Sequence, residues 1–356
     1  MFSSISKKTN QGLWLGIIIG LFFTFIIFPF IIVDKALAAD KEMKLTMASY
    51  IPVGYPYVYP AQKIFVDMVN ERGKGIVQLN MYWGGTLLKG KQLLPGLQAG
   101  TADIIFHTGA YLLGSYPIIG VQILPIWDDI ESSYNGLKIG TPLSKLQNQE
   151  MNKKNLYQLG SSGMVPEFLW TRNKLVRSPK DVKGLKIRVA GKVEGKVIRI
   201  LGGSPVTMPS AELAQALQRG VVDGALMNPW TAKARGVEEF CKYMLIMPLT
   251  CQTTPIYVMR DKWDSWPENV RKILKECAIE WEPLSASEDP NAILQDSQLQ
   301  KDLIPFYKKK GMQAVFLTSD EKKVFAEAIK PIVQWWVKQV GKEVGEKALK
   351  AAGYQD

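Results

Sequence analysis

Hydrophobic positions in the first half of the chain alternate between the spacing of strands and the spacing of helices. Strand-like stretches cover residues 44–48, 77–81 and 103–107, and alternating polar residues in the second of them indicate a half-buried strand. Between them, an apolar helical face precedes Gly73, and a second helix is expected over residues 91–99. Strands and helices that alternate at this spacing favour parallel strands joined by right-handed crossovers.

The same pattern starts again in the middle of the chain. Residues 186–189 predict a strand and residues 192–201 a helix, and Ser210 is placed to cap a further helix that ends at Gly220. A short strand is expected over residues 224–227. Two such units predict an α/β fold with two lobes and a cleft between them. Because no flexible linker separates the units, we expect the chain to cross between the lobes in ordered strands.

The amino terminus carries the pattern of an export signal. Two lysines near the start are followed by a largely apolar stretch over residues 13–33 and by an Ala-Leu-Ala tripeptide at residues 36–38. A basic start, an apolar segment and an Ala-x-Ala site predict a secretory signal peptide over residues 1–38. The apolar stretch is also long enough for an uncleaved membrane anchor, which is the alternative. Either way, the rest of the chain is expected to be periplasmic.

Composition excludes several classes of protein. The 356 residues include one histidine, which excludes metal sites that need two imidazoles. The three cysteines contain no Cys-x-x-Cys pair, although Cys241 and Cys251 could pair across an intervening strand. The formal net charge of +11 is dispersed along the chain, and export removes nucleic acid as a partner.

Motifs for catalysis are absent from the sequence. Residues 191–196 look like a phosphate-binding loop, but Val197 stands where a Ser or Thr would hold the metal ion. We therefore expect a solvated helix start there. His107 ends a predicted strand without the Gly-x-Ser-x-Gly turn of a hydrolase. The sequence predicts no enzyme and no metal site.

Two polar residues stand where predicted strands end. Ile187 and Val189 point to one face of their strand and Arg188 to the other. Because both faces of a parallel sheet are normally covered, a buried arginine there needs an anionic partner or an open crevice. A salt-bridged surface arginine is the alternative. Asn228 precedes Pro229 at the corresponding side of the crevice, where it is either a turn residue or a ligand contact.

Three blocks and their separation resemble a known family. They are Val-Lys-Gly-Leu-Lys-Ile-Arg-Val at residues 182–189, Leu-Gly-Gly-Ser-Pro-Val at residues 201–206 and Leu-Gln-Arg-Gly-Val-Val-Asp-Gly at residues 217–224. Together with the Asn-Pro pair that follows, they resemble the solute-binding proteins of tripartite ATP-independent periplasmic (TRAP) transporters, the DctP-like family. The resemblance covers residues 43–340.

The resemblance implies a two-lobed periplasmic binding protein of the type II kind. Such proteins close on a small organic acid and deliver it to the membrane permease subunits of the transporter. Lobe I would combine residues 43–165 with 254–290, and lobe II residues 166–253 with 291–356. The family's carboxylate-clamping arginine matches Arg188, and an assisting asparagine matches Asn228.

The resemblance also bears on the ligand. Members that bind sialic acid carry a second arginine, where this chain has Phe168, and an acidic residue, where it has Thr108, so sialic acid is disfavoured. The other residues expected in the pocket are Trp170, Trp230, Tyr50, His107 and Ser210. This set favours a small carboxylate with an apolar or aromatic body, or a 2-oxo acid. No motif indicates a cofactor or a cation beside the ligand. Presentation of a ligand to a membrane sensor, and an exported hydrolase, are the alternative functions.

The leader generates a first prediction. Because the Ala-x-Ala site follows the apolar segment, the exported protein is expected to begin at Ala39 and to be released by osmotic shock. Amino-terminal sequencing of the released protein checks this. A chain recovered from the membrane fraction with Met1 or Phe2 at its start would replace the cleaved leader with an anchor.

Overall fold

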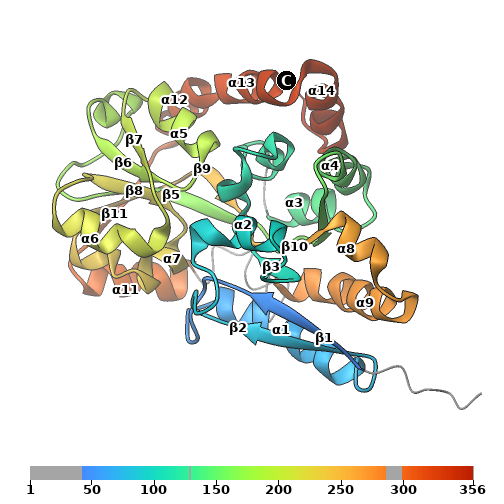
Figure 1. Cartoon of the computed structure of the whole chain (residues 1–356). Coiled ribbons are helices and arrows are strands. Elements are labelled where there is room, and N and C mark those ends of the chain that lie inside the picture. Colours follow the sequence, from blue (N-terminus) through green and yellow to red (C-terminus); the bar gives the residue numbers. More distant parts are fainter. Residues whose placement is uncertain (1–41, 128–129, 286–298, 356) are drawn as a thin grey trace, which may run out of the picture. The chain divides into compact units, whose positions relative to one another are not determined.

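The computed structural model describes residues 42–127, 130–285 and 299–355, and these build two β-sheets (Figure 1). The predicted leader lies outside the described residues. Within them, no helix combines the length and the apolar character needed to cross a membrane. The lobe boundaries proposed from the sequence remain a prediction.

The first sheet has the strand order β2-β1-β3-β10-β4. Its strands are β1 (Met43–Ala48), β2 (Val77–Tyr82), β3 (Ile104–Phe106), β4 (Leu156–Gly160) and β10 (Ile256–Met259). Strand β1 is parallel to β2 and β3, as the alternating pattern predicted, whereas β10 pairs antiparallel with β3 and β4. A strand from late in the chain therefore completes the sheet.

The second sheet has the order β11-β9-β5-β8-β6-β7. Its strands are β5 (Val165–Thr171), β6 (Lys186–Val189), β7 (Ser204–Thr207), β8 (Gly224–Met227), β9 (Tyr243–Gln252) and β11 (Gln313–Phe316). Strand β6 is parallel to β7 and β8, and β5 is antiparallel to β8 and β9. The chain passes between the sheets over residues 161–164, after β4, and over residues 253–255, before β10.

Helices cover both sheets. They are α1 (Val58–Arg72), α2 (Leu93–Gln98), α3 (Ile130–Leu137), α4 (Pro142–Asn152), α5 (Lys192–Ile200), α6 (Leu213–Gln218), α7 (Pro229–Ala234), α8 (Arg260–Ser265), α9 (Glu268–Ser285), α11 (Ile304–Lys309), α12 (Ser319–Ile329), α13 (Pro331–Val340) and α14 (Lys342–Ala351). Helices α1 and α9 pack together beside the first sheet (Figure 1). There, Phe65, Phe106 and Trp281 form a cluster of edge-on and tilted rings.

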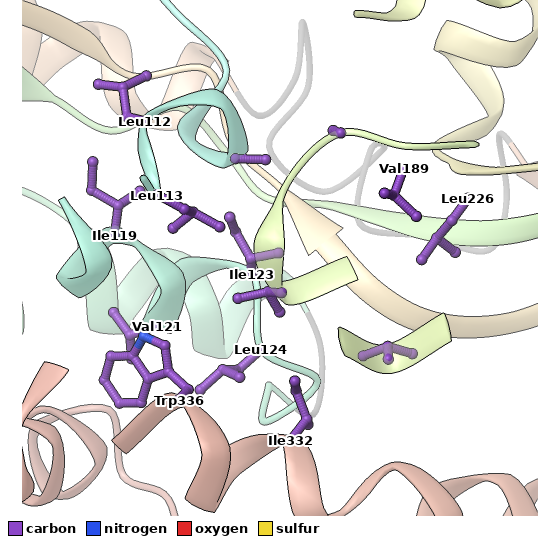
Figure 2. Packing of buried hydrophobic residues seen from close by; sticks show 14 of the residues in the cluster. Leu112, Leu113, Ile119, Val121, Ile123, Leu124, Val189, Leu226, Ile332 and Trp336 are labelled. Carbon is purple, nitrogen blue, oxygen red and sulfur yellow. The ribbon is translucent and has the colours of Figure 1, made fainter. Parts of the chain in front are cut away.

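Helix α13 contacts elements next to both sheets. It packs on α5 and on η3, the 3-10 helix Pro117–Gln122. The indole N–H of Trp336 donates to the Pro117 carbonyl at 2.9 Å, and Figure 2 shows Trp336 in the cluster that contains Val121. Gly120 is required at this contact, because a Cβ there would lie 2.4 Å from the indole nitrogen.

All three cysteines are buried and unpaired. The alternative pairing of Cys241 with Cys251 is not formed. Cys251 lies in strand β9 and Cys241 precedes it, and the extended residues 243–251 span roughly 26 Å, far beyond the reach of a disulfide.

The packing of α13 generates a second prediction. Trp336 is only 1% exposed, whereas its neighbour Trp335 is half-buried. We expect Trp336→Ala to lower the free energy of unfolding by about 3–5 kcal/mol, the cost of removing a buried indole. Trp335→Ala is the matched control and should cost clearly less. Urea denaturation measures both, and equal losses would contradict the packing described for α13.

Candidate functional site

A cavity lies where the connections from both sheets meet. Its lining includes residues after β1 and β3, both passages between the sheets, and the carboxyl ends of β6 and β8. Predicted site residues that line it are Tyr50, Thr108, Arg188, Ser210 and Asn228. Carboxyl ends of parallel strands are the usual place for ligand sites in α/β proteins.

Arg188 is fixed in the wall of this cavity. Ile187 and Val189 join the apolar core on one face of β6, so Arg188 points to the other face, as the sequence predicted. Its Nε donates to the Met208 carbonyl at 2.9 Å, and its Nη2 donates to the Tyr111 hydroxyl at 3.3 Å. Nη1 has no hydrogen-bond partner among the described residues. The side chain is 2% exposed. A guanidinium held in this way can offer Nη1 to a ligand oxygen.

Asn228 follows β8 and caps α7. Its Oδ1 accepts from the backbone N–H of Thr231 at 2.8 Å, which satisfies one of the free donors at the helix start. Its Nδ2 has no partner within the described part of the chain, and the residue lines the cavity. The turn role and the ligand role that the sequence left open are therefore compatible.

Polar contacts connect the other wall residues. The Tyr50 and Thr108 hydroxyls lie 2.6 Å apart. The backbone N–H of Ser210 donates to the Tyr111 hydroxyl at 3.1 Å, and the Ser210 Oγ accepts from Arg235 Nε at 3.3 Å. The predicted helix cap at Ser210 is wrong: Ser210 is the first residue of a 3-10 helix that follows Pro209, and its side chain makes no cap hydrogen bond.

Phe168 and Trp170 do not line the cavity, contrary to the prediction. Along β5 they alternate with Glu167, which does line it, so they point to the opposite face. There they join the cluster that includes Tyr307, whose ring centroid lies 4.8 Å from that of Trp170. The indole N–H of Trp170 donates to the Met227 carbonyl at 2.9 Å. Both residues are part of the core.

Trp230 and His107 lie one layer behind the wall. Trp230 stacks on Tyr57, which lines the cavity, with 5.0 Å between ring centroids. His107 lies edge-on to Tyr50 and Tyr111, and burial lowers its pKa to about 3, so the imidazole is neutral. The aromatic character of the wall therefore comes from tyrosines, with Trp230 and His107 as their supports.

Sequence reasoning missed two buried carboxyl groups near Arg188. Glu167 lines the cavity at 2% exposure, and its Oε2 accepts from the Thr250 hydroxyl at 2.7 Å. Glu194, on α5, is 0% exposed and accepts from the Gln252 side chain. Because Glu194 is buried, the prediction of a solvated helix start at residues 191–196 is wrong. For Glu167 the signal available in the sequence was a glutamate inside an apolar stretch, whereas Glu194 stands between Lys192 and Lys196 and gave no such signal.

Burial shifts the ionisation of both carboxyl groups. Burial, and next the charge of Glu194, raise the pKa of Glu167 well above its usual range. Burial raises the pKa of Glu194 to about 7, although the Arg188 charge lowers it. Arg188 also lowers the pKa of Glu167. The three groups therefore share one electrostatic environment.

Comparison with known proteins gives one family. The family described as bacterial extracellular solute-binding protein, family 7 (DctP), matches residues 47–339. The C4-dicarboxylate-binding periplasmic protein DctP of Rhodobacter capsulatus is 26% identical over 298 residues, which are 81% of this chain and 84% of that protein.

Two solved structures of similar fold are TRAP periplasmic solute-binding proteins. That from Desulfovibrio salexigens, with bound orotic acid, has a TM-score of 0.78 at 22% identity and covers 88% of this chain and 98% of its own. That from Ralstonia eutropha, with bound (S)-2-acetolactate, has a TM-score of 0.76 at 20% identity and covers 87% of this chain and 98% of its own. At these identities the likeness shows the fold, which confirms the predicted α/β class.

The buried carboxyl groups generate a third prediction. A carboxyl group whose pKa is raised in the folded protein binds more protons there than in the unfolded chain, so stability falls as pH rises from about 4.5 to 7. Over this pH range we expect the free energy of unfolding of Glu194→Gln to fall by up to about 3 kcal/mol less than that of the wild type, judged from about 1.4 kcal/mol per pKa unit. Urea denaturation from pH 5 to 8 measures it.

The exposed Glu346 supplies the control for this experiment. Glu346→Gln should leave the pH profile of stability as it is in the wild type. If Glu194→Gln shows the same profile as wild type, Glu194 is ionised in the folded protein at acidic pH.

Proposed function

Because the chain belongs to the bacterial extracellular solute-binding proteins of family 7, we propose that it captures a small organic acid in the periplasm and delivers it to a TRAP-type membrane permease. The observation that carries this proposal is Arg188. Its guanidinium is buried in a cavity wall, two of its nitrogens are held by protein acceptors, and Nη1 is left for a ligand. The planar donors of a guanidinium match the geometry of a carboxylate.

The relatives support a carboxylate ligand. The Rhodobacter protein is described as binding C4-dicarboxylates, and the two solved structures hold orotic acid and acetolactate, each of which carries a carboxylate group. Since the family consists of binding proteins, capture without catalysis is the function we propose, with no cofactor. The permease subunits are the proposed protein partners.

Capture would work by closure of the lobes predicted from the sequence. The cavity wall combines residues next to both sheets, among them Tyr50 and Thr108 on one side and Arg188 and Asn228 on the other. A ligand that contacts both sides stabilises the closed arrangement by its higher affinity for it. The permease would then recognise the closed form. Presentation to a sensor would use the same step, and the membrane partner distinguishes the two functions.

The clamp generates a fourth prediction. Arg188→Lys keeps the positive charge but loses the planar pair of donors, so we expect binding of the acid to weaken by roughly ten- to a hundredfold. A thermal-shift screen of monocarboxylates, dicarboxylates and 2-oxo acids identifies binders, and isothermal titration calorimetry measures their affinities. Unchanged affinity in Arg188→Lys would show that the carboxylate binds elsewhere.

Asn228 offers a matched pair of variants for the same titration. Asn228→Asp keeps the acceptor that caps α7 but replaces the ligand-facing amide by a carboxyl group, so binding should weaken while stability is preserved. Asn228→Ala loses the donor and the cap, and should also lower the free energy of unfolding by about 1 kcal/mol. Full affinity in Asn228→Asp would place the Asn228 amide outside the ligand site.

A further inference from the structure

One cation and one carboxyl group line the cavity, and a second carboxyl group lies behind its wall. Of the described residues that line it, Arg188 is the only one with a basic side chain and Glu167 the only one with a carboxyl group. Glu194 lies behind them and is completely buried. The next cation, Arg235, does not line the cavity; it lies over the Tyr55 ring and contacts the Ser210 hydroxyl. A ligand carboxylate at Arg188 would thus be a third acid beside the one guanidinium that lines the cavity.

Hydrogen bonding indicates that a proton belongs in this group. Glu194 Oε2 and Gln252 Oε1 are both buried acceptors without a hydrogen-bond donor in the described part of the chain. A buried acceptor that lacks a donor costs free energy. A proton on Glu194 Oε2 turns this acceptor into a donor, which the neighbouring side chains can use. Burial also raises the pKa of Glu194 to about 7, so that its proton exchanges near neutral pH.

The other groups around the pair do not compete for this proton. Arg188 comes from β6, and Thr250 and Gln252 come from β9. Burial and Glu167 both raise the pKa of Cys251, so that thiol stays neutral. Helices α12 and α13, which also pack on α5, contribute apolar residues to the shared core.

We propose that the site binds its carboxylate ligand together with one proton, which Glu167 and Glu194 share. This inference rests on the proposed function. When the ligand carboxylate pairs with Arg188, the guanidinium stabilises the ionised glutamates less, and the new negative charge repels them. A proton from solvent then joins the oxygen of an ionised glutamate. The charge that enters the closed cavity is thereby neutralised.

Proton uptake makes the affinity depend on pH in a defined direction. Binding weakens as pH rises through the range in which the free pair loses its proton, by at most tenfold for each pH unit for one proton. We expect the dissociation constant to increase by roughly tenfold between pH 6 and pH 8.5. At lower pH the free pair already holds the proton, and the dependence ends.

Calorimetry counts the proton directly. The probes are lactate, pyruvate and orotate, whose own carboxyl groups are ionised throughout the range. Titration at pH 7 in phosphate and in Tris, whose ionisation enthalpies differ, should show an uptake of more than zero and at most about half a proton for each ligand bound, since Glu194, with a pKa of about 7, is already about half protonated. Glu194→Gln should lower this number, and Glu167→Gln with Glu194→Gln should bring it to zero. Glu346→Gln is the control and should keep the wild-type value.

The outcomes separate this inference from the proposed function. Suppose that an acid binds and that Arg188→Lys weakens its binding. If the wild type then takes up no proton and its affinity for the acid is constant from pH 6 to 8.5, the proposed proton site is wrong, whereas the assignment of Arg188 to the ligand carboxylate stands. Uptake that persists in the double variant would place the proton on another group and also overturn the assignment. If none of the acids binds to the wild type, the proposed function itself fails.

Discussion

A buried guanidinium at the carboxyl end of a strand is the constraint on which the site depends. Arg188 is 2% exposed, and a charge that is removed from water needs acceptors and counter-ions. The Met208 carbonyl and the Tyr111 hydroxyl supply two contacts, and Tyr111 in turn holds the start of the helix at Ser210. The packing of strands and loops thus fixes one cation in the cavity wall, where it can bind an anionic ligand.

The two glutamates show how the protein balances that cation. A carboxyl group in the core normally lowers stability, because desolvation disfavours its charged form. Glu167 and Glu194 remain close to Arg188 although they are buried, and burial raises the pKa of each. Groups with strongly shifted pKa values collect at functional sites, where stability is given up for binding. We interpret the pair as part of the ligand site on these grounds.

The sequence predicted the direction of Arg188 because its two neighbours on β6 are apolar and period two then leaves one face for the arginine. The same rule failed for β5, which is buried on both faces, so that apolar residues occupy both and the pattern does not show which one faces the cavity. Trp170 therefore lies in the core. Glu194 was missed because the burial of α5 depends on its contacts with β9 and α13, which are remote in sequence.

A crystal structure of the protein with a bound acid would show whether Arg188 holds the ligand. We expect the two carboxylate oxygens to lie against the Arg188 guanidinium, with at least one oxygen about 2.7–2.9 Å from Nη1. An acid bound in the cavity with its carboxylate turned away from Arg188 would show that Arg188 is not the carboxylate site.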